Sequence, residues 1–392
     1  MKTVCVIGNF SGRNTGDNAI LENLLADVSE RYPKTRFTIP SINKNFIHNN
    51  YSRFPIEAVP LMPWNLSLKI FGLPVFRAIL KSNLVLVTDA ILFDHKFWNP
   101  VFNYLSTLWM AFPVAHRRQI PIVLYNGSVG PIKKSIGRRA LEEVIRCMDM
   151  VIVRDPESIA ILKKLHIEHE QIILGADCAL NTPIPNTGRL QEIFQKEGLF
   201  SNGKRTLSVN VNSYIDSFLS KGKEAFGAER FKHLITETLD RVVKDLDVNL
   251  VFVMTQVMDI KIGHEILHRM KARDRVRIIT NRDYSHNEIA GVLAHVDLHV
   301  GMRTHSVILA TASCTPTICI AYRPKNKGYM QTIEESDRLV EFDHLKDSNY
   351  LYQLICKTFS ERQNIRRKLE PIIAREKEKA KKSAEYLGKY LG

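Results

Sequence analysis

Arg303 and His305 are the side chains of this chain best suited to chemistry. They lie within residues 298–312, where an apolar run and a glycine are followed by apolar residues at helical spacing. This pattern predicts a strand that turns into a helix, with both side chains at the N-terminus of the helix. The unpaired N–H groups and partial positive charge of such an end favour an anion. Together with Lys325 and Lys327 downstream, the stretch predicts a phosphate or carboxylate site; the alternative is that Arg303 and His305 are ordinary polar residues at a helix start.

The elements that must position these residues are indicated by short apolar runs that alternate with amphipathic stretches. Eleven runs are expected as strands: residues 4–7, 35–40, 83–88, 122–125, 150–153, 172–174, 206–211, 249–254, 276–279, 298–300 and 315–320. Helices are expected at residues 136–147, 231–245, 263–271 and 285–294, and a basic loop at 322–328. This alternation predicts an α/β fold of two doubly wound domains that face a cleft. We expect the domains at residues 1–185 and 186–345, followed by a basic helical segment at 346–392.

Polar residues follow several of the predicted strands, at the edge where a parallel sheet binds ligands. They are Asp89, Asn126, Gly127, Ser128, Arg154, Gln256 and Asp259. After the first strand, the glycines at positions 8, 12 and 16 lack the spacing of a dinucleotide fingerprint, so NAD is not expected. Asp17 or Asn18 is expected to cap the helix that follows.

The composition is that of an ordinary globular protein, with 392 residues, 45% of them hydrophobic and 24% charged. No apolar run reaches the ~18 residues that a membrane span needs. The first residues lead directly into a predicted strand, so we expect no signal peptide. The six cysteines lack Cys-x-x-Cys spacing, and no Asp and His cluster suggests a metal site. A reducing cytoplasm is therefore expected, with neither disulfides nor a bound metal.

A formal net charge of +14 calls for an anionic partner. Nucleic acid is not expected, because the chain has no zinc-finger spacing and no aromatic RNP-like strand, and its basic residues are spread out. An anionic membrane surface fits at least as well. Residues 361–392 carry ten Lys and Arg against five Glu, which is typical of a solvated helix face but would also suit anionic lipid.

Aromatic and apolar residues are concentrated at residues 64–80 and 97–112. We expect the second stretch to be core; the alternative is a face, formed with the first stretch, that contacts lipid. Pro74 is expected to break or kink any helix in the first stretch.

Four motifs in order along the chain resemble those of the polysaccharide pyruvyl transferase family. They are Gly12-x-Asn14-x-Gly16-Asp17, Arg154-Asp155-x-x-Ser158, Gly301-Met302-Arg303-x-His305 and Tyr322-x-x-Lys325-x-x-Gly328. The resemblance covers about residues 4–335 and implies two Rossmann-like domains in a GT-B-like fold. It implies transfer of the enolpyruvyl group of phosphoenolpyruvate onto two hydroxyls of a sugar, as a ketal, with release of phosphate. Such chemistry belongs to surface polysaccharide or exopolysaccharide biosynthesis for the cell envelope, with phosphoenolpyruvate as co-substrate and no cofactor.

The chain departs from the family pattern at two strand ends. Thr88-Asp89-Ala90 stands where the family has a glycine triplet, and Asn126 and Ser128 replace glycines in the motif after Tyr125. The first departure concerns one wall of the site, on the acceptor side.

On this interpretation, Arg303 and His305 are catalytic, and His305 is the general acid and base, because histidine exchanges protons near neutral pH. The donor-binding residues are Arg154, Arg303, Thr304, Lys325 and Lys327, whose positive groups match a carboxylate and a phosphate. The acceptor side or cleft is formed by Asn14, Gly16, Asp17, Asp89, Asn126, Gly127, Ser128, Gln256 and Asp259. No step requires a metal.

Two other functions stay open from the sequence. A GT-B glycosyltransferase would bind a nucleotide sugar at the same basic turn, but a Glu would be expected on the following helix, and none lies between Arg303 and Tyr329. A non-catalytic member of a polysaccharide assembly complex is the second, suggested by the altered Thr88-Asp89-Ala90. The expected location is cytoplasmic, with peripheral contact at the inner face of the membrane and a lipid-linked acceptor as further options. The oligomeric state stays open.

Overall fold

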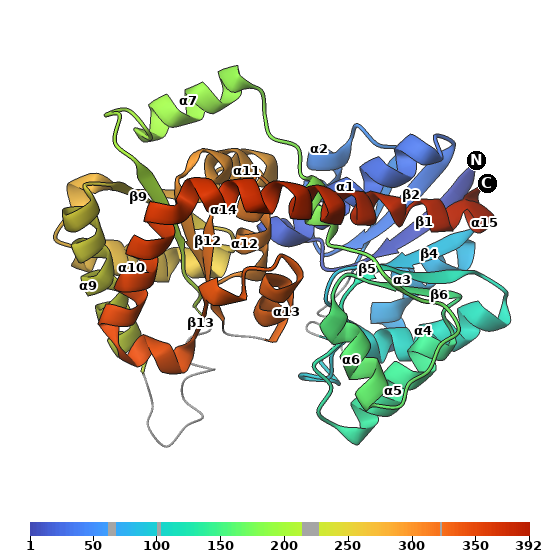
Figure 1. Ribbon diagram of the computed structural model, residues 1–392. Helices are drawn as coiled ribbons and strands as arrows, with labels where there is room; N and C mark the ends of the chain where they lie inside the picture. The colour runs from blue at the N-terminus through green and yellow to red at the C-terminus, as the bar shows by residue number, and fades with distance from the viewer. Residues whose placement is uncertain (62–67, 100–102, 214–226, 322–323) are drawn as a thin grey trace. The chain divides into compact units, whose positions relative to one another are not determined.

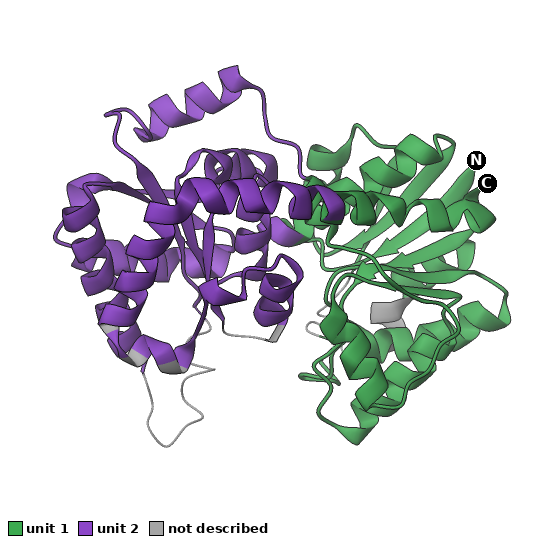
Figure 2. Cartoon of the chain, viewed as in Figure 1, with its two compact units in different colours: residues 1–12, 17–181, 376–392 green, residues 13–16, 182–375 purple. Residues whose placement is uncertain are grey.

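The structure is a computed structural model that describes residues 1–61, 68–99, 103–213, 227–321 and 324–392. It divides into two compact units, and each contains one parallel β-sheet (Figure 1 and Figure 2). Unit 1 comprises Met1–Gly12, Asp17–Asn181 and Glu376–Gly392, and unit 2 comprises Arg13–Gly16 and Thr182–Arg375.

The sheet of unit 1 has seven strands in the order β3-β2-β1-β4-β5-β6-β7. Their bounds are β1 (Lys2–Ile7), β2 (Thr35–Ser41), β3 (Ile56–Pro60), β4 (Leu84–Val87), β5 (Ile122–Gly127), β6 (Met150–Val153) and β7 (Ile172–Leu174). Every residue of β4 is buried, as expected for a parallel strand that is covered on both faces. The order of the strands reverses between β1 and β4, which makes the carboxyl ends of these strands the usual place for a ligand.

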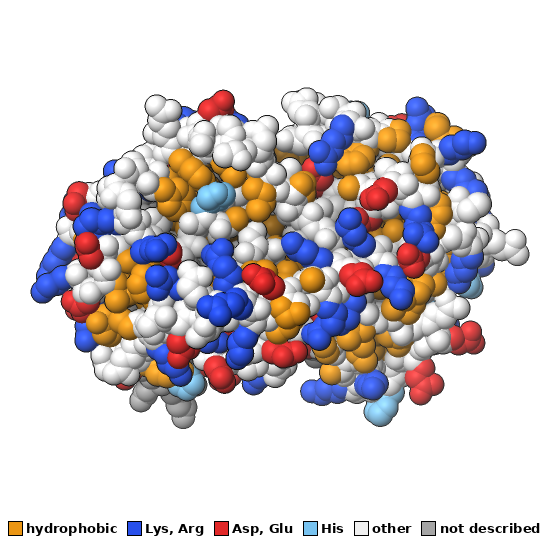
Figure 3. Space-filling view, turned by 45° about the horizontal axis from the view of Figure 1, so that its top comes forward, with side chains coloured by type: hydrophobic (Ala, Val, Ile, Leu, Met, Phe, Trp, Pro, Cys, Tyr) orange, Lys and Arg blue, Asp and Glu red, His pale blue; other side chains and the backbone are white. Residues whose placement is uncertain are grey.

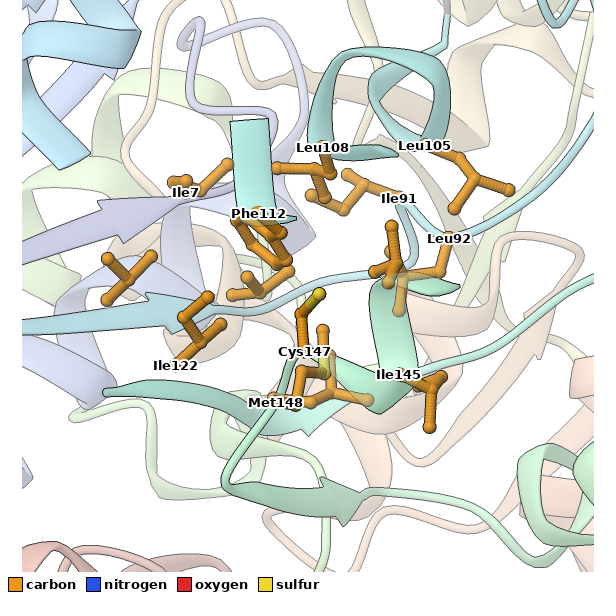
Figure 4. Packing of buried hydrophobic residues seen from close by; sticks show 14 of the residues in the cluster. Ile7, Ile91, Leu92, Leu105, Leu108, Phe112, Ile122, Ile145, Cys147 and Met148 are labelled. Carbon is orange, nitrogen blue, oxygen red and sulfur yellow. The ribbon is translucent and has the colours of Figure 1, made fainter. Parts of the chain in front are cut away.

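Helices connect the strands of unit 1 and supply the apolar residues that cover its sheet. They are α1 (Thr15–Arg31), α2 (Lys44–Tyr51), α3 (Leu68–Lys81), α4 (Tyr104–Arg117), α5 (Ser135–Arg146), α6 (Pro156–Lys164) and α15 (Gly388–Leu391). In α5 the buried residues recur at the spacing of one helix face: Gly137, Ala140, Leu141, Val144 and Ile145. Figure 4 shows part of the resulting core, a single cluster that joins β1, α4 and α5 through residues such as Ile7, Phe112 and Ile145.

The sheet of unit 2 has six strands in the order β10-β9-β8-β11-β12-β13. Their bounds are β8 (Thr206–Asn210), β9 (Asn249–Met254), β10 (Val276–Thr280), β11 (Leu298–Gly301), β12 (Thr317–Ala321) and β13 (Leu339–Glu341). All pairs are parallel, and the order reverses between β8 and β11. The helices of this half are α7 (Thr187–Glu197), α9 (Ala228–Leu246), α10 (Ile260–Arg269), α11 (His286–His295), α12 (Thr304–Thr311), α13 (Pro324–Thr332) and α14 (Ser348–Lys382).

The C-terminal helix α14 passes from unit 2 into unit 1 after Arg375. At the end of the chain, the Lys2 ammonium donates to the carbonyls of Tyr390 and Gly392, both at 2.8 Å, so the two termini lie side by side (Figure 1). The observed units therefore differ from the expected ranges in three respects, the first being a boundary after Asn181 instead of after residue 185. Residues 346–392 are divided between the units instead of forming a separate segment, and residues 13–16 belong to unit 2 instead of the first domain.

The predicted α/β fold of two doubly wound domains is confirmed, because both sheets have the strand order of a Rossmann-like fold. The predicted strands all appear. The sequence did not indicate β3, β13 or α2. Strand β3 is half-exposed at the edge of its sheet, follows Pro55 and ends on Pro60, so it lacks the apolar run of a central strand.

Three local expectations differ from the structure. Helix α3 continues through Pro74, so the proline does not break it, and the expected alternative of a kink stays a prediction. Helix α1 begins at Thr15, so Asp17 and Asn18 lie in its first turn and not at its cap. The expected basic loop is partly helical: α13 begins at Pro324, and proline suits a first helical position. Tyr322 lies outside the described residues.

The aromatic stretch at residues 97–112 is mostly core. Phe97 and Phe112 are buried, and the indole of the half-buried Trp109 donates to Glu143 at 2.7 Å. Trp98 is the exception, since 60% of its surface is exposed. Residues 64–67 and 100–102 of the two aromatic stretches lie outside the described residues. No described helix combines the length and the apolar character needed to cross a bilayer.

Candidate functional site

The turn between β11 and α12 carries Arg303 and His305, as the sequence predicts. Arg303 is the N-cap of α12, and its backbone N–H donates to Asn210 Oδ1 at 3.0 Å. Asn210 ends β8, so this bond joins the two strands at the reversal of the sheet. Gly301 is required in the turn, because a Cβ there would lie 2.8 Å from Ser306 Oγ and overlap the ring of His299. The turn therefore lies at the place where a doubly wound sheet binds ligands.

The guanidinium of Arg303 is held by Asp259, which follows β9. Its Nε and Nη2 donate to the two carboxylate oxygens at 2.7 and 2.8 Å. Asp259 is fully buried and also accepts bonds from the N–H and hydroxyl of Ser213, at 2.9 and 2.8 Å. The sequence suggests an acceptor role for Asp259, whereas its geometry is that of a residue that positions Arg303. A bidentate pair of this kind fixes both the place and the plane of the guanidinium.

His305 lies in the first turn of α12 against the backbone of Gly16, and both residues belong to unit 2. A Cβ on residue 16 would overlap the imidazole and lie 2.5 Å from the Cβ of His305. Asn14 fastens this segment to the end of β9: it forms a β-bridge with Gln256, and its Oδ1 accepts the N–H of Gly16 at 2.9 Å. The predicted residues Asn14, Gly16 and Gln256 thus form one connected group, of which Gly16 lies against His305.

The side-chain amide of Gln256 has an unused hydrogen-bond acceptor within the described part of the chain. Its Oε1 is buried and has no hydrogen-bond partner among the described residues. A buried amide oxygen of this kind is an acceptor that a bound molecule can use.

Lys325 and Lys327 differ in their surroundings. Lys325 is half-buried in the first turn of α13, whereas Lys327 is exposed and pairs with Glu341 at 3.6 Å. Between them, Asn326 is buried and ties α13 to the Arg303 turn: its amide donates to the Met302 carbonyl at 2.9 Å, and the Thr304 hydroxyl donates to its Oδ1 at 3.2 Å. The sequence interpretation used the two lysines and missed Asn326, although it stands inside the same motif.

His299 is a second residue that the sequence interpretation missed. It is fully buried on β11, with Nδ1 2.8 Å from Ser208 Oγ and Nε2 3.1 Å from Ser306 Oγ. Burial lowers the pKa of His299 to about 3, so the ring is neutral at pH 7. Ser306 Oγ also donates to the Arg303 carbonyl at 2.8 Å. His299 therefore supports the turn from inside the sheet; the only sequence signal was a histidine in an otherwise apolar strand.

In unit 1, Arg154 follows β6 and is paired. Its Nη1 lies 2.7 Å from Asp177 Oδ2, with side chains 8% and 4% exposed, and its Nε donates to Ser128 Oγ at 2.8 Å. Burial lowers the pKa of Arg154, but Asp177, Asp89 and Asp155 outweigh that effect and raise it. Arg154 is thus a charged group in a fixed position, and a donor role for it stays a proposal.

Asn126 and Gly127 end β5, where Asn126 adopts a left-handed φ of 46°. Asn126 is buried: its amide donates to Cys178 Sγ at 3.3 Å and to the Ala380 carbonyl at 3.2 Å, and Ser383 donates to its Oδ1 at 2.8 Å. These contacts bind Asn126 to the C-terminal helix, and its role on the acceptor side stays a prediction.

Asp89 comes shortly after β4, and Asp17 lies in the helix that follows β1. Asp89 follows β4 with a left-handed φ of 65°, and its carbonyl accepts the N–H of Ser128 at 2.9 Å. Asp17 is buried in the first turn of α1 and accepts a bond from Asn9 at 3.2 Å. Among the described residues, no group of three or more His, Cys, Asp and Glu side chains is placed to hold a metal ion, and the six cysteines are free thiols.

Comparison with known proteins agrees with the motifs. The family model described as "Polysaccharide pyruvyl transferase" matches residues 14–324, which is most of the chain. The amylovoran biosynthesis protein AmsJ of Erwinia amylovora is 19% identical over 379 residues, covering 89% of this chain and 90% of that protein.

Solved structures share the fold. HepE of Anabaena, solved with UDP-glucose, has a TM-score of 0.66 and 15% identity, covering 99% of this chain and 100% of HepE. UDP-GlcNAc 2-epimerase of Neisseria meningitidis has a TM-score of 0.63 and 12% identity, covering 100% and 99%. The ADP-heptose heptosyltransferase II of E. coli has a TM-score of 0.52 and 12% identity, covering 93% and 100%. At these identities the likeness concerns the fold alone, which is of the GT-B type.

Proposed function

The chain belongs to the polysaccharide pyruvyl transferase family, and from this premise we propose that it transfers the enolpyruvyl group of phosphoenolpyruvate onto two hydroxyls of a sugar. The product is a ketal on the sugar, and phosphate is released. The observation that carries the proposal is the Arg303 fork, held in one plane by the buried Asp259, with His305 two residues further on.

The donor brings a carboxylate and a phosphate, which Arg303 and the half-buried Lys325 suit by charge. Asp259 binds the Nε and Nη2 edge of Arg303 and so fixes the plane in which the guanidinium meets an anion. Asp259 also offsets the positive charge of Arg303, so further attraction has to come from Lys325 and from the N–H groups at the start of α12. Arg303 then contributes mainly orientation.

The reaction balances without a cofactor. In the first step a sugar hydroxyl oxygen bonds to C2 of phosphoenolpyruvate while C3 takes up a proton and becomes a methyl group. In the second step another hydroxyl of the same sugar bonds to C2, and the bond from C2 to the phosphate oxygen breaks. The two hydroxyl protons balance the proton gained by C3 and the one carried by the departing phosphate. We assign His305 to moving these protons.

The test is phosphate release from phosphoenolpyruvate with p-nitrophenyl hexosides that present neighbouring hydroxyls. His305→Gln should lower kcat by about 10²–10⁴-fold with an unchanged melting temperature. The matched control is His264→Gln, an exposed histidine of α10, which should leave kcat unchanged. Near wild-type turnover by His305→Gln would contradict the assignment.

A nucleotide-sugar glycosyltransferase is the second candidate, because HepE was solved with UDP-glucose on a similar fold. It predicts that UDP-glucose raises the melting temperature and that phosphoenolpyruvate does not. A non-catalytic chain predicts a shift from neither ligand.

We further propose peripheral contact of a cytoplasmic enzyme with anionic lipid and, through it, a lipid-linked acceptor. The net charge of +14 supports this contact, as do Trp98 and Met110, which are 60% and 45% exposed. On the face in Figure 3, Lys and Arg are interspersed with Asp and Glu, so attraction on that side is diffuse. The protein should sediment with phosphatidylglycerol vesicles at low salt and be released by high salt; a protein that stays in the supernatant at low salt would contradict the contact.

A further inference from the structure

Asp89 stands at the carboxyl end of β4, beside β1, where the strand order of unit 1 reverses. Only 6% of the residue is exposed. Its backbone is left-handed, a conformation that Asp adopts at some energetic cost and Gly adopts without one. The bond from the Ser128 N–H to its carbonyl fixes this conformation. A glycine would satisfy the same backbone, so the backbone does not explain why a carboxylate stands here.

Tyr104 approaches the same place from α4. It is the first residue of that helix, whose N-cap Asn103 accepts the Ser106 N–H at 3.0 Å and donates to the Phe93 carbonyl at 2.7 Å. The loop after Asp89 and the start of α4 also pack together, because Ile91 and Leu92 share one apolar cluster with Leu105 and Leu108 (Figure 4). The helix start is thereby fixed against the segment that carries Asp89.

Within the protein, the Asp89 carboxylate acts on the buried Arg154 by charge, since it helps to raise the pKa of Arg154. Neither the Asp89 carboxylate nor the Tyr104 hydroxyl makes a hydrogen bond with any residue in the described part of the chain. Burial first, and then the negative charges of Asp89 and Asp17, raise the pKa of Tyr104, so its hydroxyl keeps its proton and Asp89 lies within electrostatic reach. A carboxylate that can accept and a phenol that can donate are thus both without a hydrogen bond near a ligand-binding edge, on two segments that Asn103 ties together.

We propose that Asp89 and Tyr104 bind the saccharide acceptor, with Asp89 accepting a hydrogen bond from one sugar hydroxyl and Tyr104 donating a hydrogen bond to a neighbouring sugar oxygen. This inference deepens the proposed function and rests on it for the identity of the acceptor as a sugar. The pair lies entirely in unit 1, so it selects the acceptor independently of the Arg303 and His305 turn of unit 2. Asp89 and Tyr104 are binding residues for hydroxyls, and the proton transfers stay with His305.

The test measures glycoside binding by saturation-transfer difference NMR with p-nitrophenyl β-galactoside, β-glucoside and β-mannoside. Asp89→Gly keeps a backbone that suits the left-handed conformation, and Tyr104→Phe keeps the ring, so both variants should fold. Each should raise the Kd of the best-bound glycoside by about tenfold, and Asp89→Asn by less, because an amide oxygen still accepts. The control is Thr107→Val, one turn further along α4, which removes a buried hydroxyl without a hydrogen-bond partner among the described residues and should leave Kd unchanged.

Equal binding by wild type and both variants would overturn the proposal, and so would the absence of binding of all three glycosides to the wild type. The same proteins are tested for the shift of melting temperature with phosphoenolpyruvate. If that shift is absent while glycoside binding depends on Asp89, the donor assignment fails and the saccharide site stands. If the shift is present and glycoside binding ignores Asp89 and Tyr104, the saccharide site fails alone.

Discussion

Gly16 lies so close to His305 that residue 16 has no room for a side chain. A Cβ there would overlap the imidazole and lie 2.5 Å from the Cβ of His305, so the whole histidine would have to move and not only the end of a flexible side chain. The two residues are 289 positions apart and meet because Asn14 and Thr15 are bonded to the end of β9. Gly16 of the first motif and His305 of the third motif therefore pack against each other, and this contact sets the position of the imidazole.

Gly16→Ala should therefore lower turnover by about 10²-fold, since a displacement of about 1 Å at a catalytic group has that effect. The control is Gly188→Ala in α7, where a Cβ meets only Asn186 Oδ1 at 3.6 Å. That control should keep full turnover and gain up to about 1 kcal/mol of stability. Comparing kcat and melting temperature of the two variants checks the prediction; wild-type kcat in Gly16→Ala would refute it.

Asp259→Asn should lower the free energy of unfolding, because it breaks the buried ion pair with Arg303. Replacing the buried carboxylate leaves a guanidinium that is 15% exposed without its charged partner, and breaking such a pair costs about 3–5 kcal/mol. The exposed pair of Arg146 and Glu142 is the matched control, and Glu142→Gln should cost at most about 0.5 kcal/mol. Urea denaturation of both variants gives the two values. A loss below about 1 kcal/mol in Asp259→Asn would mean that the pair does not hold Arg303 in place.

His299 should make the protein less stable in acid. Its pKa is about 3 in the folded protein, while an unfolded histidine titrates near its ordinary value of about 6.5. Between these two values the unfolded chain takes up a proton that the folded protein does not, so the free energy of unfolding falls as pH falls. The slope contributed by this residue is at most about 1.4 kcal/mol per pH unit. His299→Gln should flatten the difference in unfolding free energy between pH 7.5 and pH 5; an unchanged difference would show that His299 is protonated in the fold.

Asp27 should act in the opposite direction. Burial raises the pKa of Asp27 to about 7, an effect that Lys381 partly offsets and Glu30 increases. Its Oδ2 is buried without a hydrogen-bond partner among the described residues. The folded protein therefore holds a proton that the unfolded chain releases at lower pH, and stability falls as pH rises from about 4 to 7. Asp27→Asn should gain about 1–3 kcal/mol at pH 8 and much less at pH 4; a loss of stability at pH 8 would contradict the buried charge.

The sequence predicted the fold well where a strand or helix has a clear local pattern of apolar residues. Strands β4 and β6 are continuous apolar runs, and the turn at Gly301 combines a strand end, a glycine and helical spacing. Strand β3 and helix α13 were not predicted, because their sequences lack such local signals. The residues of β3 are mostly half-exposed, and α13 begins with a proline and contains a glycine, so each carries the composition of a loop.

The candidate site was predictable only in its parts. Arg303, His305 and Lys325 follow from their motifs. The pairing of Arg303 with Asp259 depends on β8 lying between β9 and β11, and this strand order cannot be read from the local spacing of residues. The contact of Gly16 with His305 depends on a segment of four residues that belongs to unit 2. Such relations are set by tertiary packing, and they pair Asp259 with Arg303, while an acceptor role for Asp259 stays a prediction.

The measurement that tests the central claim most directly is the shift in melting temperature caused by phosphoenolpyruvate in the wild type and in Arg303→Lys. The variant keeps the positive charge and loses the planar fork. Arg269→Lys, an exposed arginine paired with Glu229, is the control. The account predicts that phosphoenolpyruvate stabilises the wild type and the control, by about 2.7 kcal/mol at a hundred times Kd, and that Arg303→Lys loses most of this effect. Equal shifts in all three proteins would place the donor away from Arg303, and no shift in the wild type would contradict phosphoenolpyruvate as the donor.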